Sequence, residues 1–278
     1  MSDMRSSIVI TVFSTASGIG KTFVAINIAA ELARLGHSVC LLDLDLQFGD
    51  VCNYLQLNPA QTISDVQSTL ERNQSNFRAD YFLTEYHRGG VNFFILPPPP
   101  KVIESYNIQS ATVERLVGDL NGFEFIIIDT PKIFSDLLLT ALDLSTIITF
   151  LCVADFVPAI KNLKVGYDTL RRFNYDENKI RLVQNRSDSQ KLILTEDVEE
   201  VLGKKFYFNL PNDYASARRS IDAGRPLVLD GNSTALSIAL KQLVAQYINR
   251  NAAAVEPEQN DAGFLSWVKG FFGGRKKN

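Results

Sequence analysis

Residues 14–22, Ser-Thr-Ala-Ser-Gly-Ile-Gly-Lys-Thr, constrain the fold of this chain more than any other segment. They follow an apolar run at residues 8–13 and open a helical pattern, which is the context that a phosphate-binding loop requires. In such a loop, backbone N–H groups and the positive end of the following helix face phosphate oxygens. The sequence therefore predicts a nucleoside triphosphate site, in which Lys21 reaches the β- and γ-phosphates and the Thr22 hydroxyl binds Mg²⁺.

This loop departs from the common pattern G-x-x-x-x-G-K-[ST], because Thr15 occupies the position of the first glycine. Residues 16–22 instead resemble the variant loop K-G-G-x-G-K-[ST] of the ParA/MinD ATPases, with matches at Gly18, Gly20, Lys21 and Thr22. Ala16 stands where that family has its signature lysine. The alternative is an ordinary glycine-containing turn, which the strand–loop–helix context disfavours.

Short apolar runs alternate with helical segments along the chain. The runs lack the period-two alternation of half-exposed strands and are typical of strands buried on both faces; they lie at residues 8–13, 38–42, 92–96, 125–128, 146–153, 180–183 and 206–208. Helices are expected near residues 22–35, 62–71, 109–121, 158–173, 195–202, 214–222 and 233–250. This alternation predicts an α/β fold, a doubly wound and mostly parallel sheet with helices on both faces.

The same pass along the chain predicts its organisation. We expect one P-loop ATPase domain at residues 1–250, a flexible acidic linker at 251–263 and an amphipathic basic tail at 264–278.

Carboxylates follow two of the expected strands. Asp43 and Asp45 come after residues 38–42, and Asp129 ends the run at 125–128. Ligands of open α/β sheets bind beyond the carboxyl ends of the strands, and an apolar run that leads into one aspartate resembles the Walker-B element, which holds Mg²⁺. Either carboxylate alone could cap a helix or a turn. Their combination with a phosphate-binding loop favours the metal.

At this point a closer family resemblance emerges. Residues 43–50, Asp-Leu-Asp-Leu-Gln-Phe-Gly-Asp, resemble a segment of the CpaE/TadZ proteins, the MinD-like ATPases of Tad (type IV-like) pilus and secretion systems. The resemblance covers residues 8–230 and includes Asn185, Arg186 and residues 210–213. It implies a MinD/ParA-like protein that dimerises with ATP and localises or organises a pilus or secretion apparatus at the membrane.

Transferred residue by residue, the resemblance implies a complete ATP and Mg²⁺ site. The metal would be supported by Thr22, Asp43 and Asp129, and the catalytic residues would be Lys21 and Asp45, the latter positioning the attacking water. The nucleotide would be bound by Ser17, Gly18, Ile19, Gly20, Lys21, Thr22, Asn185, Arg186, Pro211 and Asp213. Judged without the resemblance, Asn185 reads more simply as a turn residue after a strand.

The resemblance has two departures. In ParA/MinD relatives the signature lysine reaches the phosphates of the partner protomer, so Ala16 predicts slow or impaired hydrolysis with binding retained. Lys132 could replace part of that charge, although an exposed, solvated lysine is the simpler interpretation. The second departure is that CpaE/TadZ proteins usually carry a receiver-like domain before the ATPase, whereas the ATPase pattern here begins at residue 8.

Charge and cysteine content bear on partners and compartment. The net charge of −3 and the scattered basic pairs at 171–172, 204–205 and 218–219 make nucleic acid an unexpected partner. Three cysteines without C-x-x-C spacing indicate the reducing cytoplasm.

The end of the chain combines apolar and basic residues. An apolar helical face is expected within residues 264–272, followed by Arg275, Lys276 and Lys277. This pattern predicts peripheral attachment to anionic lipids at the inner face of the membrane. A terminal helix packed on the protein core is the alternative.

Two other functions remain open. One is a ParA/MinD-type partition or cell-division positioning ATPase, and the other is an inert scaffold that uses ATP as a structural ligand.

Overall fold

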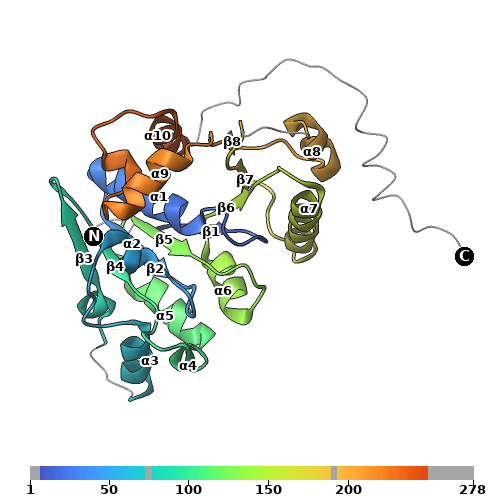
Figure 1. Ribbon diagram of the computed structural model, residues 1–278. Helices are drawn as coiled ribbons and strands as arrows, with labels where there is room; N and C mark the ends of the chain where they lie inside the picture. The colour runs from blue at the N-terminus through green and yellow to red at the C-terminus, as the bar shows by residue number, and fades with distance from the viewer. Residues whose placement is uncertain (1–6, 73–76, 189–192, 250–278) are drawn as a thin grey trace, which may run out of the picture.

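Residues 7–72, 77–188 and 193–249 are described in the computed structural model, and they form an eight-stranded sheet covered by helices (Figure 1). The strand order is β3-β4-β2-β5-β1-β6-β7-β8, and every neighbouring pair is parallel except β3 with β4. The strands are β1 (Ile8–Phe13), β2 (Val39–Asp43), β3 (Thr84–Arg88), β4 (Val91–Leu96), β5 (Phe125–Asp129), β6 (Ile147–Cys152), β7 (Ile180–Gln184) and β8 (Phe208–Asn209). The predicted doubly wound, mostly parallel fold is therefore confirmed.

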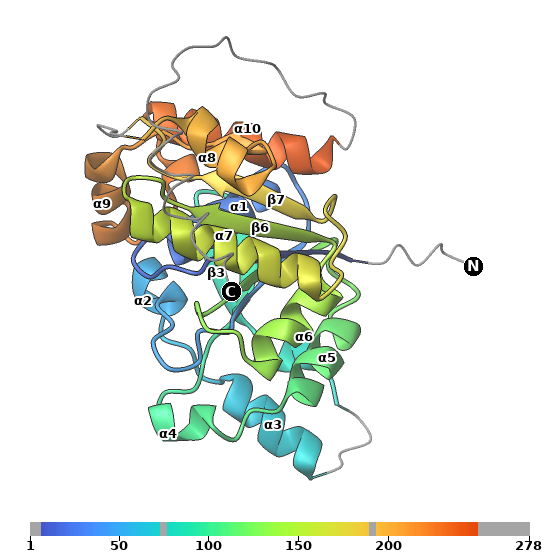
Figure 2. The same cartoon turned by 90° about the vertical axis from the view of Figure 1, so that its right-hand side faces the viewer.

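Helices cover both faces of this sheet. The α-helices are α1 (Lys21–Arg34), α2 (Val51–Leu55), α3 (Ile63–Glu71), α4 (Val102–Ser105), α5 (Ser110–Asp119), α6 (Asp136–Leu144), α7 (Val157–Arg172), α8 (Thr195–Leu202), α9 (Tyr214–Asp222) and α10 (Ala235–Ile248), with short 3₁₀ turns at Ala79–Phe82 and Leu227–Leu229. Helices α1 and α10 pack on one face, and α3, α5, α6, α7 and α8 pack on the other. Figure 2 shows α10 above the strands and α3, α5 and α6 below them.

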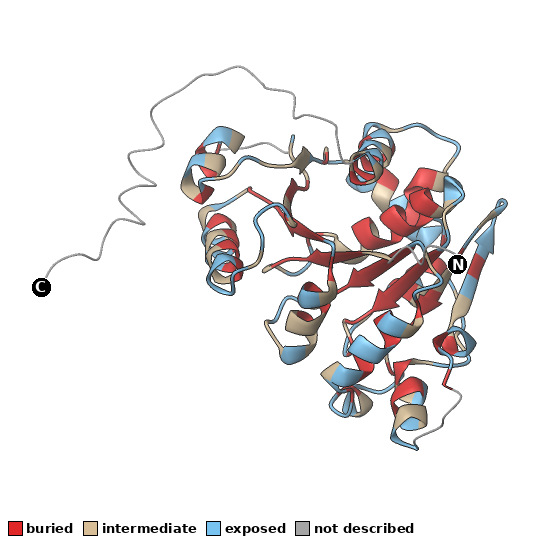
Figure 3. Ribbon diagram, turned by 180° about the vertical axis from the view of Figure 1, so that it is seen from behind, coloured by how far each residue is buried: buried red, intermediate tan, exposed pale blue. Residues whose placement is uncertain are grey.

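Strand side chains alternate between these two layers. In β5, Phe125 and Ile127 belong to the same hydrophobic cluster as α1, whereas Ile126 and Ile128 pack with α3 and α5. The central strands are accordingly buried on both sides (Figure 3). This arrangement explains why their sequences are continuously apolar, since both faces exclude water.

Strand β3 was missed by the sequence analysis. Only Tyr86 of this strand is buried, because β3 is an edge strand that pairs with β4 alone. Its remaining residues are polar or charged, so no apolar run marks it. Gly89 and Gly90, both with positive φ, form the turn to β4, and a Gly-Gly pair between two strands is a recognised hairpin signal.

Within the described residues, no helix is both long and apolar enough to cross a membrane. The expected linker and tail at 251–278 lie outside those residues.

Gly166 of α7 brings this helix against the phosphate-binding loop. A Cβ atom at this position would lie 2.4 Å from the Thr15 Cγ2 methyl and 2.9 Å from Phe150 Cζ. Thr15 is the residue that replaces the first glycine of the common loop pattern. The missing side chain at Gly166 therefore accommodates the larger side chain at Thr15.

We expect Gly166→Ala to reduce the free energy of unfolding by about 1–3 kcal/mol, because the added methyl overpacks this contact. Urea denaturation would measure the change. Gly118→Ala is the matched control: it also lies in a helix, but a Cβ atom at Gly118 would meet no neighbouring atom within 4 Å among the described residues, so stability should stay level or rise by about 0.5–1 kcal/mol. Adding Thr15→Ser to Gly166→Ala should restore part of the loss. An unchanged stability in Gly166→Ala would contradict the packing argument.

Candidate nucleotide-binding site

A cavity of about 710 Å³ lies at the carboxyl ends of the central strands. The start of α1, the loop after β2, the loop after β7 and helix α9 surround it. Most of the predicted site residues line it together: Ser17, Gly18, Gly20, Lys21, Thr22, Asp45, Asn185, Arg186, Pro211 and Asp213. The other three predicted residues do not line the cavity and are buried: Ile19, Asp43 and Asp129.

The phosphate-binding loop ends at the start of α1. Gly18 and Gly20 have φ angles of 68° and 96°, in the left-handed region that glycine adopts without strain. Helix α1 begins at Lys21, and no side-chain cap among the described residues occupies the backbone N–H groups of its first turn. Free N–H groups at a helix start suit an anion such as phosphate.

Asp129, the last residue of β5, is held beneath this loop. One carboxylate oxygen, Oδ2, accepts a hydrogen bond of 2.6 Å from the Thr22 hydroxyl. The other, Oδ1, is buried without a hydrogen-bond partner among the described residues. Burial raises the pKa of Asp129 to about 7, although Thr22 and the charge of Lys21 act in the opposite direction. A buried, unpaired carboxylate oxygen beside a hydroxyl is a suitable donor set for a cation such as Mg²⁺.

Asp43 lies beside Asp129 in the neighbouring strand, in direct register. Its carboxylate accepts hydrogen bonds from the backbone N–H groups of Asp45, at 3.1 Å, and Val51, at 3.2 Å. Burial and the charge of Asp129 raise the pKa of Asp43 well above its ordinary value. Asp43 therefore organises the loop that carries Asp45.

Gly49 makes this loop possible, and the sequence analysis assigned it no role of its own. A Cβ atom at Gly49 would lie 2.4 Å from Asp43 Oδ2. Only glycine lets the loop pass this close to the carboxylate. Gly49 lies within residues 43–50, and its place in that segment, close after Asp43 and Asp45, was the sequence signal that could have indicated this role.

Across the described part of the chain, no group of three or more His, Cys, Asp or Glu side chains forms a ready metal site. The Thr22 hydroxyl and the unpaired Asp129 oxygen offer two oxygen ligands, which fits a cation that takes its other ligands from bound phosphates and water, as Mg²⁺ commonly does.

The side chains of Asn185 and Arg186 donate hydrogen bonds to backbone carbonyl groups of the phosphate-binding loop. The Asn185 Nδ2 group donates to the Ile19 carbonyl at 2.7 Å, and an Arg186 Nη2 group donates to the Gly18 carbonyl at 3.1 Å. A Cβ atom at Gly20 would lie 3.1 Å from Asn185 Nδ2. Besides lining the cavity, both residues therefore fix the loop backbone. Recognition of adenine by Asn185 stays a prediction.

Pro211 and Asp213 form the rim of the cavity before α9. Asp213 is the N-cap of α9, where its Oδ1 accepts from the Ser216 N–H at 3.0 Å. Burial opposes the charged form of Asp213, but hydrogen bonds from Ser216 and Thr234 and the charge of Arg219 together lower its pKa. The base-binding role of these two residues also stays a prediction.

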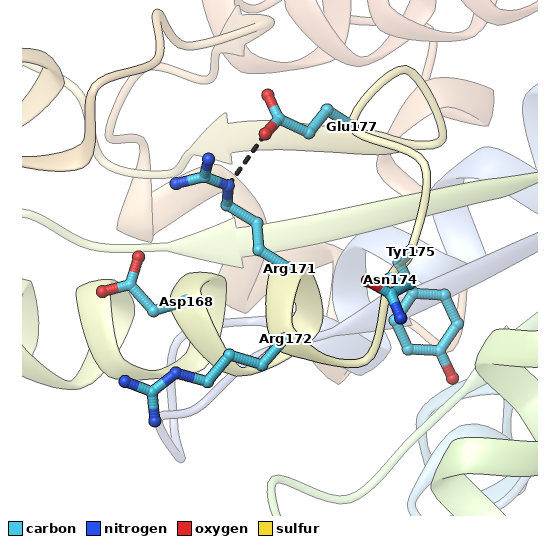
Figure 4. Close-up of a pocket in the computed structure, with 6 residues that line it drawn as sticks. All are labelled: Asp168, Arg171, Arg172, Asn174, Tyr175 and Glu177. Carbon is cyan, nitrogen blue, oxygen red and sulfur yellow. Dashed lines mark ion pairs between the residues drawn. The ribbon is translucent and has the colours of Figure 1, made fainter.

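A second cavity, of about 490 Å³, lies where α7 ends, near the amino end of β7 and away from the nucleotide-binding cavity (Figure 4). It contains the basic pair Arg171 and Arg172 together with Asp168 and Glu177, and Arg171 forms an ion pair of 2.8 Å with Glu177. Arg218, from another basic pair, is paired with Asp222 at 2.9 Å. These basic residues therefore lie among carboxylates.

The chain is similar to proteins of one nucleotide-binding family. The family model described as the CobQ/CobB/MinD/ParA nucleotide-binding domain matches residues 10–226. The septum site-determining protein MinD of Thermotoga maritima is 26% identical over 235 residues, which covers 81% of this chain and 82% of that protein. The iron–sulfur cluster carrier protein of Pyrococcus abyssi is 25% identical over 262 residues, covering 87% and 85%.

Two solved structures share the fold. The ParA family ATPase from Chlorobium tepidum TLS gives a TM-score of 0.77 at 18% identity, covering 86% of this chain and 98% of that one. The MinD protein of Pyrococcus horikoshii OT3, solved in complex with Mg-ADP, gives a TM-score of 0.72 at 19% identity, covering 87% and 96%.

The raised pKa of Asp129 predicts how the nucleotide-free protein responds to pH. Between the unfolded carboxyl value of 3.8 and about 7, the folded state retains a proton that the unfolded state loses. The contribution of Asp129 to the free energy of unfolding should therefore fall as the pH rises through this window. The slope for this single proton is about 1.4 kcal/mol per pH unit, and the contribution should stay constant above the window.

Urea denaturation between pH 4 and 8, with a chelator present, would compare the wild type with Asp129→Asn. The amide keeps an acceptor for Thr22 but does not titrate, so the variant should show the shallower decline. Parallel curves for the two proteins would contradict the assignment.

Proposed function

Because this chain belongs to the CobQ/CobB/MinD/ParA nucleotide-binding domain family, we propose that it binds Mg-ATP in the cavity formed by the phosphate-binding loop. The observation that carries the proposal is the Thr22 hydroxyl bonded to Asp129, whose second oxygen is buried and unpaired within the described structure. The relative from P. horikoshii, solved with Mg-ADP, supports the choice of nucleotide and metal.

Five residues on the phosphate side of the site have a proposed role. Lys21 binds phosphate oxygens, and Thr22 and Asp129 hold the metal, with Asp43 fixing the adjoining loop. Asp45 lines the cavity from that loop and orients the attacking water. When bound, Mg-ATP supplies the transferable phosphoryl group and the positive charge that offsets its oxygens. Such a reaction depends on positioning and charge neutralisation more than on covalent chemistry.

Hydrolysis is proposed to be slow. Ala16 is partly buried against the hydrophobic core and offers no charge to a partner's phosphates. Lys132, the candidate substitute, is exposed and does not line the cavity. Binding does not depend on either residue.

The cavity rim supports a nucleotide-dependent homodimer. Large exposed apolar side chains follow several strands at the carboxyl edge of the sheet: Phe48, Ile133, Phe156 and Tyr214, with exposed fractions of 74%, 65%, 57% and 67%. Phe48 and Tyr214 line the cavity itself, and exposed apolar side chains beside a ligand site are typical of a docking surface. A second copy of the chain that meets this edge would cover both the side chains and the nucleotide.

For the cellular role we propose organisation of a Tad or type IV-like pilus or secretion apparatus at the membrane. This finer assignment rests on the resemblance of residues 43–50 to the CpaE/TadZ segment. The relatives named MinD and ParA favour the alternative, a partition or division-site positioning ATPase. Measured turnover would separate both from an inert scaffold.

Two substitutions test the nucleotide site. Lys21→Ala should weaken equilibrium binding of a fluorescent ATP analogue, because backbone N–H groups cannot replace a full positive charge. Asp45→Asn should keep that affinity and lose single-turnover hydrolysis. Asp50→Asn is the matched control, since Asp50 lines the same cavity with no assigned role. Unchanged affinity in Lys21→Ala would remove the assignment.

The tail at residues 264–278 generates a membrane prediction from its sequence. One amphipathic helix binds a bilayer weakly, whereas a dimer that presents two binds far better through effective concentration. Co-sedimentation with anionic liposomes should be strong with ATP, weaker without it, and lost in a variant that ends at Asp261. That variant should still bind ATP. Equal sedimentation of the truncated and full-length proteins would eliminate the anchor.

A further inference from the structure

A buried hydroxyl pair joins α2 to α9 beside the nucleotide-binding cavity. Tyr54 of α2 is buried, and its hydroxyl is hydrogen-bonded to the Ser220 hydroxyl of α9. Ser220 Oγ donates its single proton to the Arg225 carbonyl, at 2.7 Å. Tyr54 is therefore the donor to Ser220, and burial raises the pKa of Tyr54 to about 12, further above neutral pH than the ordinary tyrosine value.

Two further side chains hold the same end of α9. Gln56 follows α2 in the left-handed conformation, and its Nε2 donates to the Asp222 carbonyl at 3.0 Å. Arg88, from the end of β3, donates to the carbonyls of Ala223, at 3.2 Å, and Gly224, at 3.0 Å. The last carbonyl of α9 and the carbonyls of the two residues that follow it are thus bonded by side chains from elsewhere in the chain.

Helix α2 continues the loop that carries Asp45. Its first residue, Val51, donates its N–H to Asp43 at 3.2 Å. Helix α9 begins at the rim residues, since Asp213 is its N-cap. A contact between α2 and α9 therefore joins the phosphate side of the cavity to the proposed base side.

Tyr54 also contacts the helix of the phosphate-binding loop. Its ring lies edge-on to that of Phe23, with centroids 6.4 Å apart, and Phe23 directly follows Thr22. Three segments that line the cavity thus meet at this one side chain.

We propose that Tyr54 is a positioning residue for the site, whose hydroxyl bond to Ser220 makes the loop carrying Asp45 and the rim carrying Asp213 move as one unit. Phosphate bound on the α1 side then orders α9, and a base bound at the rim fixes Asp45. The inference rests on the proposed function.

Hydrogen exchange with magnesium tripolyphosphate as the probe tests this proposal, because the probe lacks the base proposed to lie against Pro211 and Asp213. Arg218 of α9 also lines the cavity, so the deciding comparison is between the wild type and variants that lack the hydroxyl bond. In the wild type, the probe should slow exchange at residues 17–22 and also at residues 214–222 of α9. In Tyr54→Phe and in Ser220→Ala, protection should persist at 17–22 and be reduced about tenfold in α9, the effect of one net hydrogen bond. The double variant should show no further loss.

Tyr247→Phe is the matched control. Its hydroxyl is also buried and bonded, to Thr149 at 2.7 Å. Tyr54 lines the cavity whereas Tyr247 and Ser220 do not, so Ser220→Ala shows whether a loss comes from the hydroxyl bond rather than from the cavity wall. The Tyr247→Phe variant should lose similar stability but keep protection of α9. Single-turnover hydrolysis of ATP should fall about tenfold in Tyr54→Phe and in Ser220→Ala but not in Tyr247→Phe, with the ATP dissociation constant nearly unchanged.

The outcomes separate the two proposals. Absence of protection at residues 17–22 in the wild type would overturn the proposed function and this inference with it. Protection at 17–22 without protection of α9 in the wild type, or equal protection of α9 in Tyr54→Phe, would overturn the inference alone. An equal loss of α9 protection in Tyr247→Phe would mean that Tyr54 contributes only to packing, and would also overturn the inference.

Discussion

Burial of two carboxylates side by side is the constraint on which the site depends. Asp43 and Asp129 end adjacent strands in register and are both buried, which is costly unless hydrogen bonds or positive charge compensate. Asp43 is satisfied by backbone N–H groups, so the loop from Asp45 to Val51 must fold tightly over it, and Gly49 alone allows that approach. In Asp129, one carboxylate oxygen accepts from the Thr22 hydroxyl, and the other has no hydrogen-bond partner among the described residues. One oxygen is left for a cation, and the geometry of the phosphate-binding loop is tied to the sheet below it.

The phosphate-binding loop is positioned by contacts from distant parts of the chain. Asn185 and Arg186 bind its carbonyl groups, and Gly166 leaves space for Thr15. Thr15, which replaces the first glycine of the common loop pattern, is therefore accommodated by α7 without displacing the phosphate-binding loop. A loop supported from several sides presents its N–H groups to a ligand without reorganisation, which favours binding of a charged group.

The family and the fold leave the cellular role open. Relatives of similar identity are named as a septum site-determining protein and as an iron–sulfur cluster carrier. One nucleotide-binding framework thus serves several purposes, because function lies in the surfaces attached to it. For this chain the surfaces that we propose are the carboxyl edge of the sheet with the exposed Phe48 and Ile133, and, from the sequence alone, the tail at residues 264–278.

The sequence by itself determined the features that depend on local pattern. Continuous apolar runs identified the central strands, and the lysine and threonine after Gly20 predicted a phosphate site at the start of α1. Aspartates at strand ends were predictable because parallel strands deliver their carboxyl ends to one edge. Strand β3 escaped because an edge strand needs no apolar run. The contacts of Asn185 with Ile19, and of Tyr54 with Ser220, each join residues 166 positions apart, and only the tertiary structure decides such pairs, since no local periodicity encodes which distant side chains will meet.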